Sequence, residues 1–262
     1  MKRKHIAVLF FLGSLLAVSC SKMDALFNNG DPVTEYRSVG QPFHVVSMYN
    51  NVNVNLVQDS HPRLELICPE NLIENITTEI KGDTLIIKNE NGHNWLRSYD
   101  YSIDLIVYYD SLREVHYASI GELRNNDSIK GMGQLRIDST GVEIDTIWSQ
   151  SFILRINEGS GNIDLTFDCD VLKTVFNNGT SKATLHGYAG YTEHYMKSYG
   201  TIHAETLNSN IVSVSSESTN DIYVWARTKL VARIYSIGNV YYKGHPWIEK
   251  HIVGEGQIIK ME

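Results

Sequence analysis

The stretch Gly161–Leu165, with the sequence Gly-Asn-Ile-Asp-Leu, decides the fold because its pattern returns at nearly constant intervals. Ser181–Leu185 (Ser-Lys-Ala-Thr-Leu) and Gly200–Ala204 (Gly-Thr-Ile-His-Ala) repeat a turn residue followed by two alternating apolar residues. Successive turn residues are separated by 20, 20, 20, 19, 20 and 18 positions. They are Gly121, Gly141, Gly161, Ser181, Gly200, Asn220 and Gly238. A fixed period of this length is typical of a solenoid.

A second apolar strand follows about ten residues later in most of these units, although the unit around Thr192–Met196 fits poorly. These second strands are Gln134–Ile137, Phe152–Ile156, Leu172–Phe176, Ile211–Val214 and Leu230–Ile234. Two short strands cannot bury their own apolar face, but stacked units can. The pattern therefore predicts an all-β solenoid over residues 119–262. An antiparallel sandwich with regularly spaced turns is the alternative, because it also places strands every 8–12 residues.

Residues 41–118 are predicted to form a less regular β-strand part of the same domain, which covers 41–262. Val52, Val54 and Leu56 alternate with asparagines, and Ile103–Val107 repeats the alternation. Such alternation is typical of half-buried strands. One short helical piece is expected around Asn71–Ile76.

The N-terminus carries an export signal. A basic start is followed by the apolar run Ile6–Leu16 and by Ala17-Val18-Ser19-Cys20, which predicts a signal peptide over residues 1–19. The small residues before Cys20 resemble a lipobox, so we expect Cys20 to carry the lipid that anchors the protein to a membrane. Ordinary secretion without a lipid is the alternative. Residues 20–40 are expected to form a flexible tether. Because Asp does not follow Cys20, the expected location is the outer membrane, on the periplasmic or the cell-surface side.

Charge excludes one class of partner. The formal net charge is −7, and removal of Lys2, Arg3 and Lys4 with the signal peptide makes it −10. Nucleic-acid binding needs a concentrated basic face, so no nucleic-acid partner is expected. The two remaining cysteines, Cys68 and Cys169, could pair in an oxidising compartment, but free buried thiols are the favoured interpretation because Cys68 sits in an apolar strand.

No cofactor, metal or catalytic site is predicted. Asp164, Asp168 and Asp170 could offer oxygens to calcium, yet an outward-facing strand explains them as well. The histidines of successive units, His186, His194 and His203, lack metal-ligand spacing. Phosphate-binding loops and nucleophile elbows do not occur in the sequence. Carboxylate pairs such as Glu143 with Asp145 exist, but charged residues alternate outward on any soluble strand. The numerous tyrosines are interpreted as structural.

Asp-Ser and Asp-Thr pairs followed by an apolar residue resemble the O-glycosylation signal of exported Bacteroidetes proteins. The candidate acceptors are Thr84, Ser111, Ser128, Ser139 and Thr146. The same pairs also open ordinary turns.

Several short motifs, taken in order, resemble the head-GIN-domain family of putative auto-transporter adhesins, common among Bacteroidetes lipoproteins. The motifs are Phe43–Val46, Val52–Val54, Glu70–Leu72, Gly82–Ile87, Gly159–Ile163, Val240–Pro246 and Gly254–Gly256. The resemblance covers roughly residues 43–260. It departs from the family at His245, where Asn is usual, and at Glu255, where Ser is usual. The resemblance implies a right-handed β-helix in an envelope or surface protein.

Two function classes follow from these observations. The favoured hypothesis is a lipid-anchored, non-enzymatic envelope protein with an adhesion-like role, which binds an unidentified envelope protein or glycan. A long repetitive surface suits such binding. The alternative is a carbohydrate-active enzyme, a lyase or hydrolase on a β-helix, which would need two carboxylates, or a carboxylate and a base, in one cleft.

Overall fold

The computed structural model describes residues 28–92, 101–130, 137–138, 141–142 and 151–262. The described chain is all-β, with one short 3-10 helix, η1 (Ile73–Asn75), where a helical piece was expected. The strands of the first half are β1 (Pro32–Ser38), β2 (Val45–Asn50), β3 (Asn53–Gln58), β4 (Arg63–Pro69), β5 (Ile76–Lys81), β6 (Thr84–Asn89), β7 (Asp104–Tyr109), β8 (Glu114–Ser119) and β9 (Leu123–Asn125). The others are β10 (Ile129–Lys130), β11 (Ile137–Asp138), β12 (Gly141–Val142), β13 (Ser151–Gly159), β14 (Asn162–Phe176), β15 (Lys182–Met196), β16 (Thr201–Ser216), β17 (Ile222–Ile234), β18 (Val240–Lys243), β19 (Trp247–Ile252) and β20 (Ile258–Lys260).

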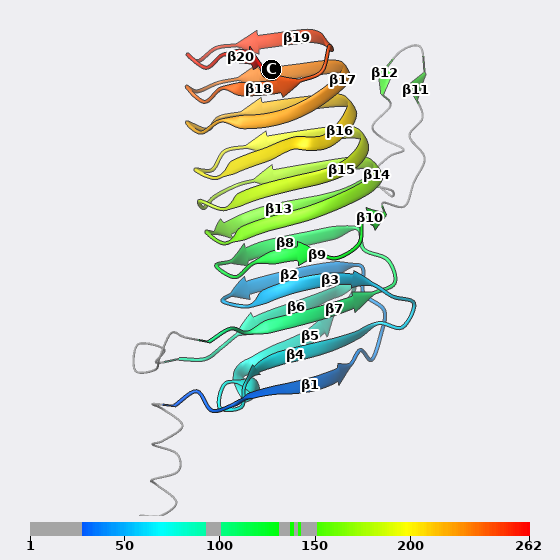
Figure 1. The fold of residues 1–262 in the computed structure, drawn as a ribbon, viewed down its shortest axis with the longest axis vertical. Helices are drawn as coiled ribbons and strands as arrows, with labels where there is room; N and C mark the ends of the chain where they lie inside the picture. The colour runs from blue at the N-terminus through cyan, green and yellow to red at the C-terminus, as the bar shows by residue number, and fades with distance from the viewer. Residues whose placement is uncertain (1–27, 93–100, 131–136, 139–140, 143–150) are drawn as a thin grey trace, which may run out of the picture.

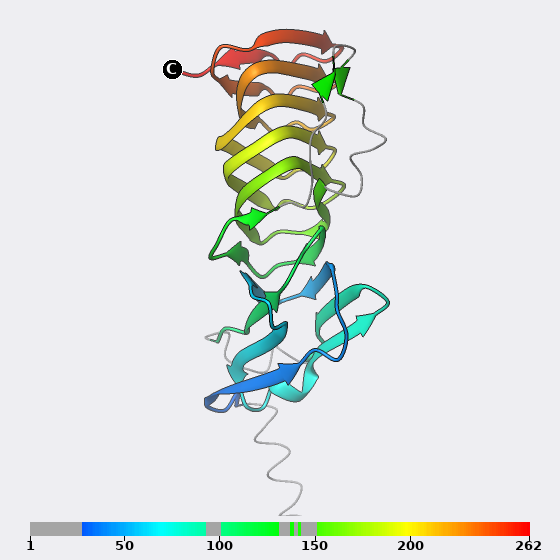
Figure 2. The same ribbon diagram turned by 90° about the vertical axis from the view of Figure 1, so that its right-hand side faces the viewer.

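Eighteen of these strands form one curled sheet whose upper part is a stack of parallel layers (Figures 1 and 2). Asn162 of β14 pairs with Lys182 of β15, twenty residues further along the chain, and β15, β16 and β17 continue the stack. The last layers are β18 and β19 on β17, and β20 on β18. All of these pairings are parallel, which does not fit the antiparallel sandwich that the sequence left open.

Apolar side chains at alternate strand positions fill the interior of the stack. One inward row consists of Ile163, Ala183, Ile202, Ile222 and Val240, each fully buried. Burial of an aliphatic side chain of this size contributes about 1.5–3 kcal/mol. The same alternation sends the residues between them outward, and those residues form the face described below.

Glycine is required where the layers approach each other at bends. Gly187 has φ +93°, which side chains rarely tolerate. A Cβ atom there would lie 2.1 Å from the carbonyl oxygen of Phe167 in the layer below.

The layer formed by β2 and β3 is out of sequence order. β2 lies between β6 and β8, and β3 lies between β7 and β9, so a segment from early in the chain sits between two later ones (Figure 1). Val46 thus pairs with Leu85 on one side and with Val115 on the other. The less regular part predicted for residues 41–118 therefore contributes layers to the same stack.

Antiparallel strands close the N-terminal end. β4 pairs with β1 and with β7, and β5 pairs with β6. The tether predicted for residues 20–40 does not extend through Pro32–Ser38, because those residues form β1. Val33, Glu35 and Arg37 alternate inward along β1 and are half-buried, an alternation that the polar composition of the segment obscured.

The unit predicted to begin at Gly141 joins the stack only through its second strand. Phe152–Ile156 lies in β13, which pairs with β8 and β14, whereas Gly141 and Val142 are not part of the stack. Leu123 of β9 pairs directly with Ile163 of β14, which leaves no place for a layer between them. Gly141 and Val142 form β12, which pairs antiparallel with β11 in a separate two-stranded sheet. The predicted strand Gln134–Ile137 lies mostly outside the described residues.

Both cysteines of the domain, Cys68 and Cys169, are free and buried. Burial raises the pKa of the Cys68 thiol to about 11 and that of the Cys169 thiol to about 12. This agrees with the interpretation of both residues as small core hydrophobes.

Candidate functional site

A polar groove crosses the outward face of β7, β3, β9, β14 and β15. It consists of two adjoining hollows, with volumes of about 290 and about 480 Å³, and Arg124 lines both of them. The outward side chains that the groove presents are Ile67, Ile106, Asp104, Asn53, Asn55, Glu122, Arg124, Asn162, Asp164, Lys182 and Thr184.

One straight row of outward residues forms the axis of the groove. Ile106, Asn55, Arg124, Asp164 and Thr184 are successive register partners across five neighbouring strands. Neighbouring strands lie about 4.8 Å apart, so the row offers one side chain per strand to anything that lies across the sheet.

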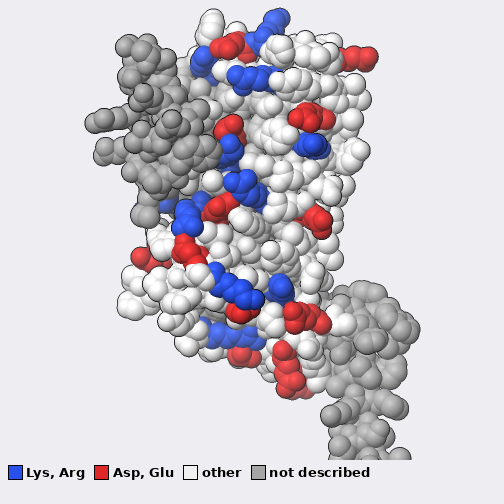
Figure 3. All heavy atoms as spheres, turned by 180° about the vertical axis from the view of Figure 1, so that it is seen from behind, with Lys and Arg blue, Asp and Glu red and all other residues white. Residues whose placement is uncertain are grey.

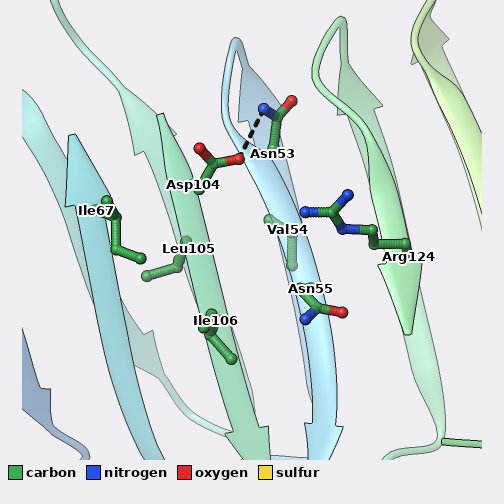
Figure 4. Close-up of a pocket in the computed structure, with 8 residues that line it drawn as sticks. All are labelled: Asn53, Val54, Asn55, Ile67, Asp104, Leu105, Ile106 and Arg124. Carbon is green, nitrogen blue, oxygen red and sulfur yellow. Dashed lines mark hydrogen bonds between the residues drawn. The ribbon is translucent and has the colours of Figure 1, made fainter. Parts of the chain in front are cut away.

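Asn53 is held rigidly at the edge of the first hollow. Its Nδ2 donates a hydrogen bond to Asp104 Oδ1 over 3.0 Å, and its Oδ1 accepts one from the backbone N–H of Glu122 over 2.9 Å. Both ends of the Asn53 amide are therefore occupied, and Asp104 is fixed in place beside it (Figure 4).

Asn55 and Arg124 carry hydrogen-bonding groups that no described residue satisfies. The Oδ1 atom of Asn55 is buried and accepts no hydrogen bond from the described part of the chain. The Arg124 side chain is exposed, forms no hydrogen bond or ion pair with a described residue, and reaches over β3 toward Val54 (Figure 4). A buried polar atom without a partner costs about 1–3 kcal/mol, so an incoming hydroxyl or amide that donates to Asn55 would recover that cost.

The charges of the groove are mixed. Asp104, Glu122 and Asp164 face Arg124 and Lys182. Asp164 Oδ1 also lies 3.2 Å from Nε2 of His186. On the rear face of the molecule, acidic and basic residues are likewise interspersed (Figure 3).

The row continues beyond Thr184 into a ladder of stacked rings, which consists of His203, Tyr223 and Tyr241. The ring centroids are 4.7 Å apart between His203 and Tyr223 and 4.9 Å apart between Tyr223 and Tyr241, with interplanar angles of 12° and 13°. Because the rings cover one another, the faces of Tyr223 toward its neighbours are not free to stack on a sugar. For Tyr223, this agrees with the structural interpretation given to the tyrosines.

Two further charged clusters lie on the wall formed by β2, β6, β8 and β13. His44 Nδ1 lies 2.6 Å from Asp83 Oδ1, and Arg113 forms an ion pair with the same carboxylate. Partial burial by itself raises the pKa of Asp83, but hydrogen bonds from His44 and Arg113 outweigh it and hold that pKa below its usual range. Each cluster is held by ion pairs between its own side chains.

Glu114 forms the second cluster with Arg155 over 2.5 Å and with His116 over 2.9 Å. Burial raises its pKa, and the hydrogen bonds from His116 and Arg155 bring it below the usual value.

The residues singled out in the sequence do not assemble into one site. Asp164 joins the groove and Asp168 is exposed elsewhere on β14, whereas His194 is buried and His203 stands in the ring ladder. Among the described residues, no three His, Cys, Asp or Glu side chains are placed to hold a metal ion. Thr84, Ser111 and Ser128 are half-buried. Cys20, Ser139, Glu143, Asp145 and Thr146 lie outside the described residues.

Sequence reasoning missed the groove. Its residues come from strands that are far apart in the sequence, up to the 131 positions between Asn53 and Thr184 (184 − 53). Only the stack brings them together. One available signal was the asparagine series Asn51, Asn53 and Asn55, since Asn is unusual at successive outward positions of a strand.

The chain resembles several solved structures. A putative adhesin from Bacteroides fragilis matches with a TM-score of 0.74 and 18% identity, over 90% of this chain and 100% of that chain. A putative adhesin and a putative lipid binding protein, both from Parabacteroides distasonis, match with TM-scores of 0.59 and 0.58 and identities of 17% and 21%. Each of these two matches covers 90% of this chain and 99% of the other. At such identities the likeness shows the fold alone.

No curated protein matches the sequence significantly. No helix among the described residues has the length and apolar character that a membrane span needs. The sequence profile of the family described as "Putative auto-transporter adhesin, head GIN domain" matches residues 42–246. The chain therefore belongs to the head-GIN-domain family, as the order of its short motifs predicted.

Proposed function

We propose that this chain is a lipid-anchored protein of the cell envelope with a non-enzymatic, adhesion-like binding role, and that the groove around Arg124 contacts the ligand. The observation that carries the proposal is the pair of unoccupied groups, the Arg124 guanidinium and the buried Asn55 Oδ1, at the centre of a row that crosses five strands. The family's adhesin description supports the same class of function.

The proposal includes the winding of the chain. A right-handed β-helix with about 20 residues per turn accounts for the parallel pairing of segments 18 to 20 residues apart. A crystal structure in which the strands wind with the opposite hand would contradict this part.

The anchor is proposed at Cys20, in an exported outer-membrane lipoprotein. The first described residues and β1 lie at the end of the stack opposite to β19 and β20 (Figure 1), so a lipid at Cys20 would leave the groove and the C-terminal layers directed away from the membrane. Cys20→Ala should abolish labelling by a clickable palmitate analogue and move the protein from the membrane fraction to the soluble fraction. Retention in the membrane fraction would refute the anchor. Protease treatment of intact cells distinguishes the cell-surface side from the periplasmic side.

The binding role is tested with the anchored full-length protein in cells. Arg124→Ala should reduce attachment of cells to immobilised envelope extract or host surface glycans, because it removes the free donor at the centre of the groove. Arg227→Ala is the matched control, since Arg227 is also exposed and has no described partner. Equal attachment by the Arg124 variant and the unmodified protein would refute the proposed role of the groove.

A carbohydrate-active enzyme stays the second candidate, because Asp104, Glu122 and Asp164 lie in one groove. Hydrolysis or elimination of a glycosidic bond would need two of these carboxylates about 5–10 Å apart on either side of the bond. The candidate predicts depolymerisation of a polysaccharide by the purified protein, with loss of that activity in Glu122→Gln and Asp164→Asn.

O-glycosylation is proposed at Thr84, Ser111, Ser128, Ser139 and Thr146. Mass spectrometry of the protein purified from its own envelope would show a glycan mass on peptides that contain these residues.

A further inference from the structure

We propose that the groove binds an uncharged saccharide chain, laid across the strands along the row from Ile106 to Thr184. The inference rests on the proposed binding role of this groove and names the class of ligand. It follows from the free hydrogen-bonding groups, the charge balance and the direction of the row.

The unsatisfied groups of Arg124 and Asn55 call for a ligand that donates and accepts hydrogen bonds at neighbouring atoms. Arg124 can only donate, whereas Asn55 Oδ1 can only accept, and the two residues are register partners on adjacent strands. A sugar hydroxyl does both, because its oxygen accepts a hydrogen bond while its proton is donated. Two hydroxyls on adjacent ring carbons would therefore match this pair of side chains.

The charge balance argues against an acidic ligand. Three carboxylates, those of Asp104, Glu122 and Asp164, line the groove, against two cations, those of Arg124 and Lys182. An anion bound at Arg124 would lie among like charges, which costs free energy in a partly desolvated groove. Uncharged hydroxyls avoid that cost and can donate to the same carboxylates.

The direction and floor of the groove suit a chain of sugar units. The row advances by about 4.8 Å per strand, which is close to the advance of one pyranose unit along an extended glycan. Ile106 and Ile67 provide outward apolar surface at one end, on which the C–H groups of a ring can lie. Beyond Thr184, the ring ladder that starts at His203 bounds the row.

The experiment uses isothermal titration of the purified mature protein with uncharged hexasaccharides, namely cellohexaose, maltohexaose, xylohexaose and mannohexaose, and with hexagalacturonate. We expect at least one uncharged chain to bind, with an affinity that is unchanged between about 50 and about 500 mM salt, because screening affects only charged partners. Arg124→Ala should weaken that binding by about tenfold or more, the loss expected for a hydrogen bond to a charged group. Asn55→Leu, which fills the space but cannot accept, should weaken it similarly.

The matched control Arg227→Ala should bind as the unmodified protein does, and thermal melting should show that each variant is folded. Binding of hexagalacturonate alone, weakened by salt, would overturn the inference in favour of an acidic ligand. Binding of none of the uncharged chains would also overturn it. If no uncharged chain binds but cell attachment still depends on Arg124, the proposed binding role stands and only the ligand class is wrong. If no uncharged chain binds and attachment does not depend on Arg124, the groove is not the binding site.

Discussion

Leu123 on β9 pairs in parallel with Ile163 on β14, forty residues further along the chain. Every later layer pairs with one that is only 17 to 20 residues away. The strands described between these layers, β11 and β12, pair only with each other, so this excursion of the chain stands outside the eighteen-stranded sheet. Lys130 is opposite Asp168 and Ser151 is opposite Val171, so only two residues of β14 separate the points of exit and return.

Excision of residues 131–150, with Lys130 joined to Ser151 through two residues, should therefore leave a folded protein. The joined segment would follow β14 without interruption, and a shorter loop reduces the entropy lost on folding. We expect one cooperative thermal transition within a few degrees of the parent. A control variant lacks Gly200–Thr219. This deletion removes one layer of the stack and joins the two layers that flank it in the same register. Loss of cooperative melting in the first variant alone would show that the excised segment supports the stack.

The sequence predicted the period but not this excursion, and the reason is physical. The excursion is about as long as one layer, and Gly141 stands midway between Gly121 and Gly161, so the spacing of turn residues looks uninterrupted. The place of β2 and β3 between later layers was equally hidden, because it depends on which edges pair over long distances and not on local pattern. The groove could not be predicted from the sequence for the same reason, since Asn55 and Arg124 become neighbours only through that out-of-order layer.

Gly187→Ala should destabilise the fold by about 3 kcal/mol, from overpacking and backbone strain together. The new Cβ would lie 2.1 Å from the Phe167 carbonyl oxygen, at a φ of +93°. Urea denaturation followed by circular dichroism measures the free energy of unfolding. Gly40→Ala is the control, because a Cβ there meets no atom within 4 Å, and it should change stability by less than about 0.5 kcal/mol. Equal stability of the two variants would contradict the close approach of the layers.

His194 should make stability fall in mild acid. It is fully buried next to the hydroxyl of Thr174, 2.8 Å from Nδ1, and burial lowers its pKa from 6.5 to about 4. As pH falls from about 6.5 to about 4, the unfolded chain takes up a proton that the native state does not, so native stability decreases. At about 1.4 kcal/mol per pH unit, the loss attributable to His194 is about 3 kcal/mol. Below about pH 4 this contribution levels off.

Denaturation at several pH values tests this with His194→Gln, which cannot titrate but can still bond to Thr174. The variant should lose about 3 kcal/mol less than the parent between pH 7 and about pH 4. His245→Gln, at an exposed position, should leave the pH dependence unchanged. The same slope in parent and His194 variant would mean that another group governs acid unfolding.

Replacement of Lys250 by an apolar residue should convert the C-terminal end into a self-association surface. Val214, Ala232 and Lys250 are register partners on β16, β17 and β19. Val214 and Ala232 are fully buried, so Lys250 places a charge at the end of an inward row. An inward-pointing charge on an edge strand opposes pairing with another chain. Lys250→Ile should therefore shift sedimentation toward dimers and larger species as concentration rises, whereas Lys250→Arg, which keeps the charge, should sediment like the parent. Unchanged sedimentation of the isoleucine variant would show that the charge of Lys250 is not what keeps copies apart.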